Sequence, residues 1–443
     1  MYNPEMKIFM KNDIPKRPLS EKVLRRHTEL LDELLPLVDR LVLDEKRPAD
    51  VLLAQYFRTH KEFGSRDRRF LSQAIFSFFR WRGWSVEKLK LPLKEASLLG
   101  VALDNETLSE SFLFLEKQAA LPLKLEILLD KKTLDEKMQV LNDAFKEQPD
   151  FQPLQIIDLV PEGFQKLTNP DKLEKYIVAF QARPLTWIRA RNNPDDLLEI
   201  LNKETLAQAH PFVATALSID GGKSLVQLLP KQDAKYVVQD VASQCVAHVC
   251  NPQKGEDWWD TCAGAGGKAL HLNDLMQQEG KVLATDIRPE SLQKLKKRAR
   301  KYGIRTIRIQ PHNMINDDPF KKTFDGVLVD APCSGWGTWA RNPDARWRSS
   351  NRNVMQAANR QLKILDNARY CVKPGGVLVY AVCTGTGPET EEVVMLFLEK
   401  NPNFKLDPFP SPLTGETTSG MLQIDPWEGD GMFIARFIRT DDA

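Results

Sequence analysis

Two cysteines in this sequence each follow an apolar run, which is an unusual place for a thiol. The run VLVDAPC carries Asp330 and ends at Cys333, and the run VLVYAVC ends at Cys383. Short apolar runs are typical of buried strands. If these strands are parallel neighbours, both thiols and the carboxylate lie in one cleft, because the carboxyl ends of parallel strands meet at one edge of a sheet. Cys371 lies in a helical pattern, and we interpret it as an inert buried thiol.

Two thiols and a carboxylate suit methylation at carbon 5 of cytosine. That carbon is a poor nucleophile until a thiolate adds to carbon 6 of the ring. An acid near N3 favours the addition because it offsets the charge that builds on the ring. The second thiol can then act as the base that helps to release the product. The residues alone leave open whether Cys333 or Cys383 is the nucleophile.

A glycine-rich loop follows an earlier apolar run. Three glycines in TCAGAGGKALHL (Thr261–Leu272) let the backbone turn tightly and approach a ligand closely. The loop is not a phosphate-binding Walker loop, because Ala269 follows Lys268. Asp286 ends the next apolar run at the spacing where an acid binds ribose hydroxyls. This pairing predicts a site for S-adenosylmethionine or a dinucleotide.

The elements that position these groups begin near Tyr236. Short apolar runs alternate with helical stretches such as Ala269–Gln278 and Pro289–Tyr302. This alternation predicts an α/β domain over residues 236–443, with a mostly parallel Rossmann-like sheet and helices on both faces.

Two smaller parts precede this domain. Apolar residues recur at helical spacing through residues 17–149, which predicts an all-helical domain. Residues 161–235 form a mixed α+β segment, with the extended stretch ARPLTWIRARN and a helix over Pro194–Ala207. Arginines near the helix at Phe70–Trp81 suit contact with a polyanion or simple solvation.

Composition limits the class of protein. The chain has 443 residues, 42% of them apolar and 28% charged, so we expect a soluble cytoplasmic protein of several domains. No apolar run is long enough to cross a membrane, and no secretory signal is evident. Six cysteines in a reducing compartment are expected to be thiols. CVAHVC (Cys245–Cys250) is an incomplete ligand set, so no metal site is expected.

Several sequence blocks agree with one known family. DTCAGAGGK, ATD, VLVDAPCSGWG, RNPDARWR and YAVCT resemble the signature blocks of the RsmB/Nop (Sun) RNA cytosine-5 methyltransferases. ARPLTWIRARN, YVVQDVASQ and WEGDGMFIARFIR resemble flanking blocks of that family, so the resemblance covers Pro161–Arg439. YFRTHKEFGSRDRRFLSQAIFSFFRW resembles the NusB-like helical domain of bacterial RsmB more weakly, and this favours ribosomal RNA as the substrate.

The resemblance implies a role for each site residue. Cys383 would be the nucleophile, Cys333 would assist release, and Asp330 would lie beside the methyl donor and the target base. Asp286 would bind the ribose of S-adenosylmethionine, and Asn313 would lie near its adenine. The cofactor loop would comprise Cys262, Ala263, Gly264, Ala265, Gly266, Gly267 and Lys268.

This sequence departs from the family pattern at a few positions. Ala265 stands where the family has proline, and Asn313 stands where it has aspartate. Around Cys383 the family reads Thr-Cys-Ser, whereas this chain has Val382 and Thr384, and its next proline, Pro388, lies one residue later.

RNA contact is predicted at the segment that follows the Cys333 turn. Arg341, Arg346 and Arg348 could hold phosphates, and Trp347 could stack on a splayed base. The target cytosine should be flipped out or single-stranded. A lysine-rich helix at Pro289–Tyr302 fits either RNA contact or a solvated face.

Three alternatives stay open. An NAD-dependent oxidoreductase could use the same glycine loop but leaves the two thiols unexplained. A non-catalytic RNA-binding ribosome-assembly factor fits the altered block around Cys383. The substrate could also be tRNA, and we expect a monomer.

Overall fold

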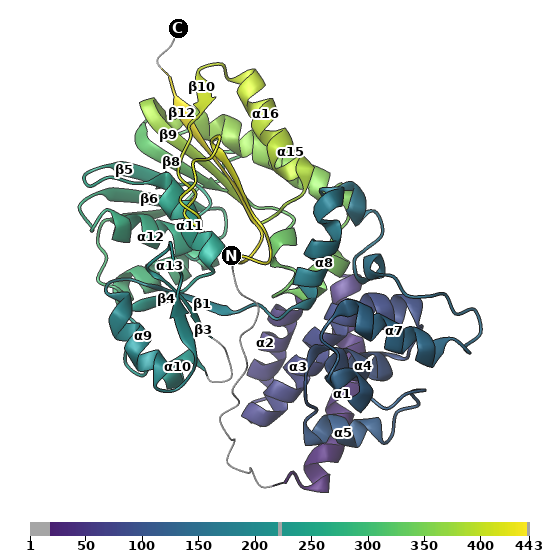
Figure 1. Ribbon diagram of the computed structural model, residues 1–443. Coiled ribbons are helices and arrows are strands. Elements are labelled where there is room, and N and C mark those ends of the chain that lie inside the picture. The colour runs from purple at the N-terminus through teal and green to yellow at the C-terminus, as the bar shows by residue number, and fades with distance from the viewer. Residues whose placement is uncertain (1–17, 220–223, 441–443) are drawn as a thin grey trace. The chain divides into compact units, whose positions relative to one another are not determined.

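The computed structural model describes residues 18–219 and 224–440. The chain divides into two compact units, residues 1–155 and 156–443. Figure 1 shows the helices of the first unit and the sheets of the second.

The first unit is built from helices, and its described residues contain no strand. Long amphipathic helices bury one apolar face, such as Leu31, Leu34 and Val38 of the first helix. The elements are α1 (Glu21–Leu43), α2 (Ala49–Thr59), α3 (Ser65–Arg82), the π-helical turn η1 (Gly83–Lys88), α4 (Leu93–Asp104), α5 (Glu110–Glu116), α6 (Glu126–Leu129) and α7 (Leu134–Phe145).

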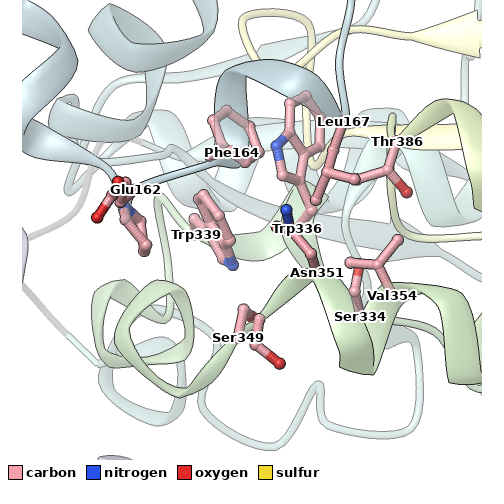
Figure 2. A pocket seen from close by; sticks show the side chains of 12 residues that line it. Glu162, Phe164, Leu167, Ser334, Trp336, Trp339, Ser349, Asn351, Val354 and Thr386 are labelled. Carbon is pink, nitrogen blue, oxygen red and sulfur yellow. The ribbon is translucent and has the colours of Figure 1, made fainter.

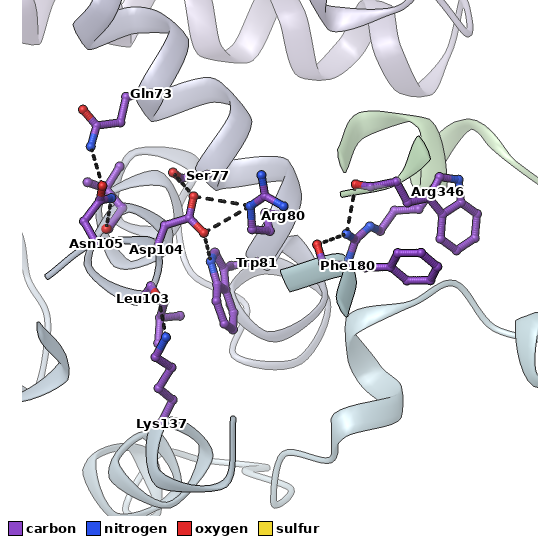
Figure 3. A network of polar contacts seen from close by, with 12 residues as sticks. Gln73, Ser77, Arg80, Trp81, Leu103, Asp104, Asn105, Lys137, Phe180 and Arg346 are labelled. Atoms are coloured by element: carbon purple, nitrogen blue, oxygen red, sulfur yellow. Dashed lines mark hydrogen bonds and ion pairs between the residues drawn. The ribbon is translucent and has the colours of Figure 1, made fainter. Parts of the chain in front are cut away.

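Buried polar contacts hold α3 against α4 (Figure 3). The Asp104 carboxylate accepts hydrogen bonds from the Ser77 hydroxyl at 2.8 Å and the Trp81 indole at 3.0 Å, and it pairs with Arg80. Arg82, at the same helix end, pairs with Asp39. Arg80 and Arg82 are therefore structural, and the expected contact with a polyanion does not extend to them.

The second unit begins with a small antiparallel sheet in the order β2-β3-β1-β4. One helix covers it through Leu197 and Leu201, which lie in the same core cluster as Ile188 of β1. The elements up to this sheet's last strand are η2 (Ile156–Leu159), η3 (Phe164–Lys166), η4 (Pro170–Lys172), α8 (Leu173–Gln181), β1 (Thr186–Ala190), α9 (Pro194–Asn202), β2 (Ala207–Ala209), β3 (Ala216–Ile219), α10 (Leu225–Leu228) and β4 (Tyr236–Val238).

The helix expected over Pro194–Ala207 is shorter than predicted. It ends at Asn202, and the side-chain oxygen of Asn202 accepts the N–H of Ala207 at 2.9 Å. Ala207 then pairs with Ile219 in the small sheet. A local side-chain bond thus ends the helix and starts a strand.

A mostly parallel eight-stranded sheet follows, in the order β10-β12-β9-β8-β5-β6-β7, with β11 paired to β12. Strands β5 to β9 run parallel, and β12 is antiparallel to β9. The strands are β5 (Asp257–Asp260), β6 (Lys281–Asp286), β7 (Ile307–Pro311), β8 (Phe324–Asp330), β9 (Val372–Val382), β10 (Phe404–Leu406), β11 (Met421–Ile424) and β12 (Met432–Arg439). Strand order reverses at β5 and β8, which is where ligands bind in such sheets.

Helices cover both faces of this sheet (Figure 1). One face packs on α11, α12 and α13 through residues such as Leu328, and the other packs on α15 and α16 through Val327 and Val329. The helices and turns are α11 (Val241–Cys250), α12 (Gly267–Leu275), α13 (Pro289–Lys301), η5 (Trp336–Thr338), α14 (Pro343–Arg348), α15 (Asn351–Ala368), η6 (Arg369–Cys371), η7 (Gly387–Glu389) and α16 (Glu391–Lys400).

The predicted fold class is confirmed: an α/β sheet with helices on both faces, preceded by a small antiparallel sheet and a helical region. None of the helices in the described ranges is long and apolar enough to span a membrane.

Candidate active site

The two strand-end cysteines meet at the carboxyl edge of the large sheet. Strands β8 and β9 are parallel neighbours, and Asp330 is opposite Ala381 in their register. The chain leaves both strands at the same level, and this brings Cys333 Sγ to 3.0 Å from Cys383 Sγ. Both side chains are partly buried thiols.

The two thiols are not equivalent. The pKa of the Cys333 thiol lies well above its usual value, first because of its hydrogen bond with Cys383 and then because of burial. The charges of Cys383 and Glu389 act in the same direction. Cys333 therefore keeps its proton at neutral pH and can donate it towards the Cys383 sulfur.

Lys268 reaches the same edge from the glycine loop. Its Nζ lies 2.8 Å from Asp330 Oδ2. Burial acts to lower the pKa of Lys268, but the Asp330 carboxylate outweighs it, and Cys383 and Asp260 add to the rise. The ammonium group is therefore charged and offsets the negative charge of Asp330. The sequence placed Lys268 only in the cofactor loop, so this pairing was missed.

Asp260 ends β5 behind the loop and is fully buried. Its pKa is raised to about 8, first by burial and then by the nearby Asp330 charge, while Lys268 acts to lower it. The carboxyl group is thus protonated at neutral pH and gains a charge only slightly above it. Sequence reasoning missed Asp260 too, although an acid at the end of an apolar run was the available signal.

The glycine loop makes the tight turn that its sequence predicts. Gly264 and Gly266 have φ of +53° and +86°, a region in which residues other than glycine are strained. A Cβ on Gly266 would lie 2.1 Å from Leu295 of α13, so this glycine is also required for packing. Ala263 donates its N–H to Thr285 of β6 at 2.8 Å.

The loop and the acid that follows it are joined directly. Gly264 donates its N–H to Asp286 Oδ2 at 2.8 Å. Arg288 donates to the same carboxylate from its backbone and its guanidinium group. Burial alone would raise the pKa of Asp286, but the bonds from Arg288 outweigh it and the pKa is lowered. An ionised carboxylate beside a glycine backbone suits a ribose.

The remaining residues of the predicted cofactor site lie around this turn. Cys262 packs on one core face of the sheet, and burial raises the pKa of its thiol to about 12. The Ala265 carbonyl accepts a bond from Arg298 at 2.8 Å. Asn313 follows β7 at the same sheet edge, and its side-chain oxygen accepts the N–H of Ile315 at 3.0 Å.

The arginines predicted to bind RNA are largely engaged within the protein. Arg346 is fully buried and donates to the carbonyl of Leu159 at 3.0 Å. It also donates to the carbonyl of Phe180 at 3.1 Å (Figure 3). A buried guanidinium group cannot hold a phosphate, so this part of the prediction is corrected. Arg341 contacts the carboxylates of two aspartates, Asp240 and Asp430.

Two other residues of this segment are less enclosed. Arg348 pairs with Asp344 at 3.1 Å and keeps 22% of its side chain exposed. Trp347 is partly buried. The lysine-rich α13 exposes a broader basic face, formed by Lys294, Lys296, Lys297 and Arg300.

A small pocket lies beside the Cys333 turn. Figure 2 shows the aromatic rings of Phe164 and Trp339 on one side of it, and Ser334 and Thr386 on the other. Ser334 follows Cys333 directly, and Thr386 lies in the loop after Cys383. The lining therefore joins both thiol-bearing turns to the segment that precedes α8.

The altered block around Cys383 keeps its polar contacts. Val382 is buried in the sheet core, whereas the Thr384 hydroxyl lies 3.2 Å from the Ser334 hydroxyl. Thr384 thus supplies a hydroxyl beside Cys383, at the position where the family pattern has serine.

Among the described residues, no cluster of His, Cys, Asp and Glu is arranged to hold a metal ion.

Comparison with known proteins gives one family and several relatives. Residues 247–438 match the sequence model of a family described as 16S rRNA methyltransferase RsmB/F. A probable ribosomal RNA small subunit methyltransferase B of Synechocystis is 32% identical over 63% of this chain and 65% of that protein. The Cronobacter sakazakii ribosomal RNA small subunit methyltransferase B is 29% identical over 61% of this chain and 63% of that protein. The match thus spans less than two thirds of these relatives' length.

Solved structures share the fold. The crystal structure of PH0851 has a TM-score of 0.68 and 23% identity, and covers 90% of this chain and 97% of that chain. NSun6 from Pyrococcus horikoshii, crystallised with SFG, has a TM-score of 0.55 and 17% identity, and covers 63% of this chain and 97% of that chain.

Proposed function

We propose that this protein methylates carbon 5 of a cytosine in RNA, because its residues 247–438 match the family described as 16S rRNA methyltransferase RsmB/F. The methyl donor is S-adenosylmethionine and the substrate is ribosomal RNA in the cytoplasm. One observation carries the proposal: two thiols 3.0 Å apart at the ends of adjacent parallel strands. The Asp330–Lys268 pair beside them supports it. Hydride transfer by an NAD-dependent oxidoreductase leaves these two thiols unexplained.

The resting protonation of the site favours Cys383 as the nucleophile. Cys333 holds its proton, so Cys383 is the sulfur that can accept a hydrogen bond and attack carbon 6 of the ring. The positive charge of Lys268 lies close enough to stabilise a Cys383 thiolate. Asp330, held by Lys268, would face N3 of the cytosine and offset the charge that builds there.

The cofactor loop has the features that S-adenosylmethionine needs. Gly264 has a φ of +53°, which favours glycine, and it donates its N–H to the Asp286 carboxylate at 2.8 Å, so backbone without a side chain lies beside this acid. Cys262 to Lys268 would line the donor, Asp286 would hold its ribose, and Asn313 would lie near its adenine. S-adenosylmethionine, when bound, supplies an electrophilic methyl group.

Release of the product needs a base, and Cys333 becomes one only after Cys383 has reacted. Bonding of the Cys383 sulfur to carbon 6 removes the hydrogen bond that contributes most to the high pKa of Cys333. Cys333 can then lose its proton to solvent. Its thiolate takes the proton from carbon 5, the carbon–sulfur bond breaks, and its electron pair returns to Cys383. Cys333 again carries a proton, Cys383 again carries its sulfur electron pair, and one proton has been released.

The experiment uses the full-length protein with S-adenosylmethionine and unmodified small-subunit ribosomal RNA. We expect 5-methylcytosine with wild type, a stable protein–RNA adduct with Cys333→Ala, and neither with Cys383→Ala. Methylation of tRNA but not ribosomal RNA would correct the substrate. Absence of both methylation and adduct would favour a non-catalytic assembly factor.

A further inference from the structure

Glu389 is a fully buried acid that the proposed reaction does not yet use. It ends the short turn η7, and its side chain is 0% exposed. One carboxylate oxygen accepts the N–H of Ser334 at 2.8 Å, and the other accepts the hydroxyl of Thr386 at 2.9 Å. This carboxylate accepts hydrogen bonds from neutral groups: a backbone N–H, an amide and hydroxyl groups. A buried charge is expensive, so these bonds must satisfy it.

The bonds to Glu389 come from both thiol-bearing turns. Ser334 is the residue after Cys333, and Thr384, the residue after Cys383, also donates to Glu389 at 3.4 Å. One carboxylate therefore holds the two turns together.

A second layer of bonds fixes the carboxylate itself. Gln361 of α15 donates its amide N–H groups to Glu389 at 3.0 Å and to the Pro332 carbonyl at 3.1 Å. The Tyr380 hydroxyl donates to the Gln361 side chain at 3.0 Å and lies 2.7 Å from the Glu389 carbonyl. Hydrogen bonds to a charged acceptor are roughly twice as strong as neutral ones, so the ionised form of Glu389 would hold these hydrogen-bonded turns more rigidly.

We propose that Glu389 is the positioning residue of this site: its buried carboxylate holds the Cys333 and Cys383 turns at the sulfur–sulfur distance needed for proton transfer. The charge of Glu389 also adds to the causes that raise the pKa of Cys333, after the hydrogen bond to Cys383 and burial. The inference rests on the proposed function for its role in the reaction. The titratable groups that act on the pKa of Cys333 are Cys383 and Glu389. The charges of Glu389 and Cys333 in turn add to the rise in the pKa of Tyr380.

The first test does not depend on RNA. In a Cys383→Ala background, the rate at which iodoacetamide alkylates Cys333 is measured against pH by mass spectrometry, with and without Glu389→Gln. The amide keeps the size of the side chain and removes its charge. We expect the Cys333 midpoint to move to lower pH, so that alkylation is faster at every pH below that midpoint. An unchanged midpoint would overturn the role of the charge. Glu391→Gln, at an exposed acid at the start of α16, is the matched control and should change nothing.

The second test measures positioning. The yield of RNA adduct trapped with Cys333→Ala should fall at least tenfold when Glu389→Ala is added, and Glu389→Gln should restore part of it. An S-adenosylmethionine-dependent rise in Tm shows that each variant is folded. Equal yields with and without Glu389→Ala would contradict the positioning role. If Cys333→Ala alone forms no adduct, the proposed function fails, and the alkylation experiment still decides the inference about the charge.

Discussion

At the scale of single residues, the site consists of acids and thiols whose protonation is set by their neighbours. Lys268 is shared between Asp330, Cys383 and the buried Asp260. Cys333 keeps its proton because Cys383 lies against it. The protonation states of these side chains cannot be predicted from residue type alone, because each depends on a neighbouring group that belongs to another loop.

Asp260 gives a pH-dependent prediction. Its folded-state pKa is about 8, well above the usual value for an aspartate. Between its usual pKa of 3.8 and its folded-state pKa of about 8, the folded protein binds a proton that the unfolded chain has lost. This group therefore lowers the stability as the pH rises through that range. Asp260→Asn cannot ionise. We expect the difference in Tm between Asp260→Asn and wild type to shift in favour of the variant as the pH rises. At pH 9 the variant should have the higher Tm. Parallel curves of Tm against pH would contradict this assignment.

At the scale of elements, turns rather than helices and strands decide whether the site forms. Gly266 begins α12, and its missing side chain lets α12 approach Leu295 of α13. Arg346 fastens α14 to the segments that carry Leu159 and Phe180. Gly266 and Arg346 therefore both help to position the loops that follow the strands.

Gly266→Ala should destabilise the protein more than Gly255→Ala. Both glycines have φ near +85°, so alanine adds backbone strain of roughly 1–2 kcal/mol at either position. Only at Gly266 would the new Cβ meet another side chain, whereas nothing lies within 4 Å at Gly255. We expect the fall in the free energy of unfolding to be at least twice as large for Gly266→Ala, measured by urea denaturation. Equal losses of unfolding free energy in the two variants would mean that Leu295 of α13 makes room for the new Cβ without loss of stability.

Arg346→Lys separates a structural role from RNA contact. Lysine cannot reach the carbonyls that the buried guanidinium group satisfies, so we expect a loss of about 2 kcal/mol in stability. The dependence of RNA affinity on salt should stay unchanged. Lys296→Gln on the exposed face of α13 should do the opposite: normal stability and a salt slope smaller by about 0.7–0.9 if that lysine contacts a phosphate. A reduced salt slope for Arg346→Lys would restore the original prediction.

Part of this architecture was predictable from the sequence. Alternating strands and helices predicted the large sheet, and the common direction of parallel strands predicted that the ends of β8 and β9 meet. The strand β2 was not predictable, because three residues are too few to show the alternation of apolar and polar side chains that is typical of a strand. The burial of Arg346 was not predictable, because its partners Leu159 and Phe180 lie far away along the chain. Charge patterns near a catalytic turn therefore predict RNA contact poorly without tertiary information.

At the scale of the whole molecule, the proposed chemistry belongs to one of two compact units. Every residue proposed to bind the donor or to react lies in residues 156–443. The proposed RNA-binding role of the helical unit, residues 1–155, is separate from that chemistry. Ligand binding and unfolding can therefore distinguish the two units without separating them.

We expect S-adenosylmethionine to stabilise only one of two unfolding transitions in calorimetry of the full chain. A ligand at 100 times its Kd adds about 2.7 kcal/mol to the unit that binds it. Asp286→Ala should abolish the shift, because it removes the acid proposed to hold the ribose. Asp104→Asn, which weakens the buried contacts between α3 and α4, should lower the other transition and leave the ligand-induced shift intact. A shift in both transitions would mean that the units unfold together, and a shift that survives Asp286→Ala would place the donor elsewhere.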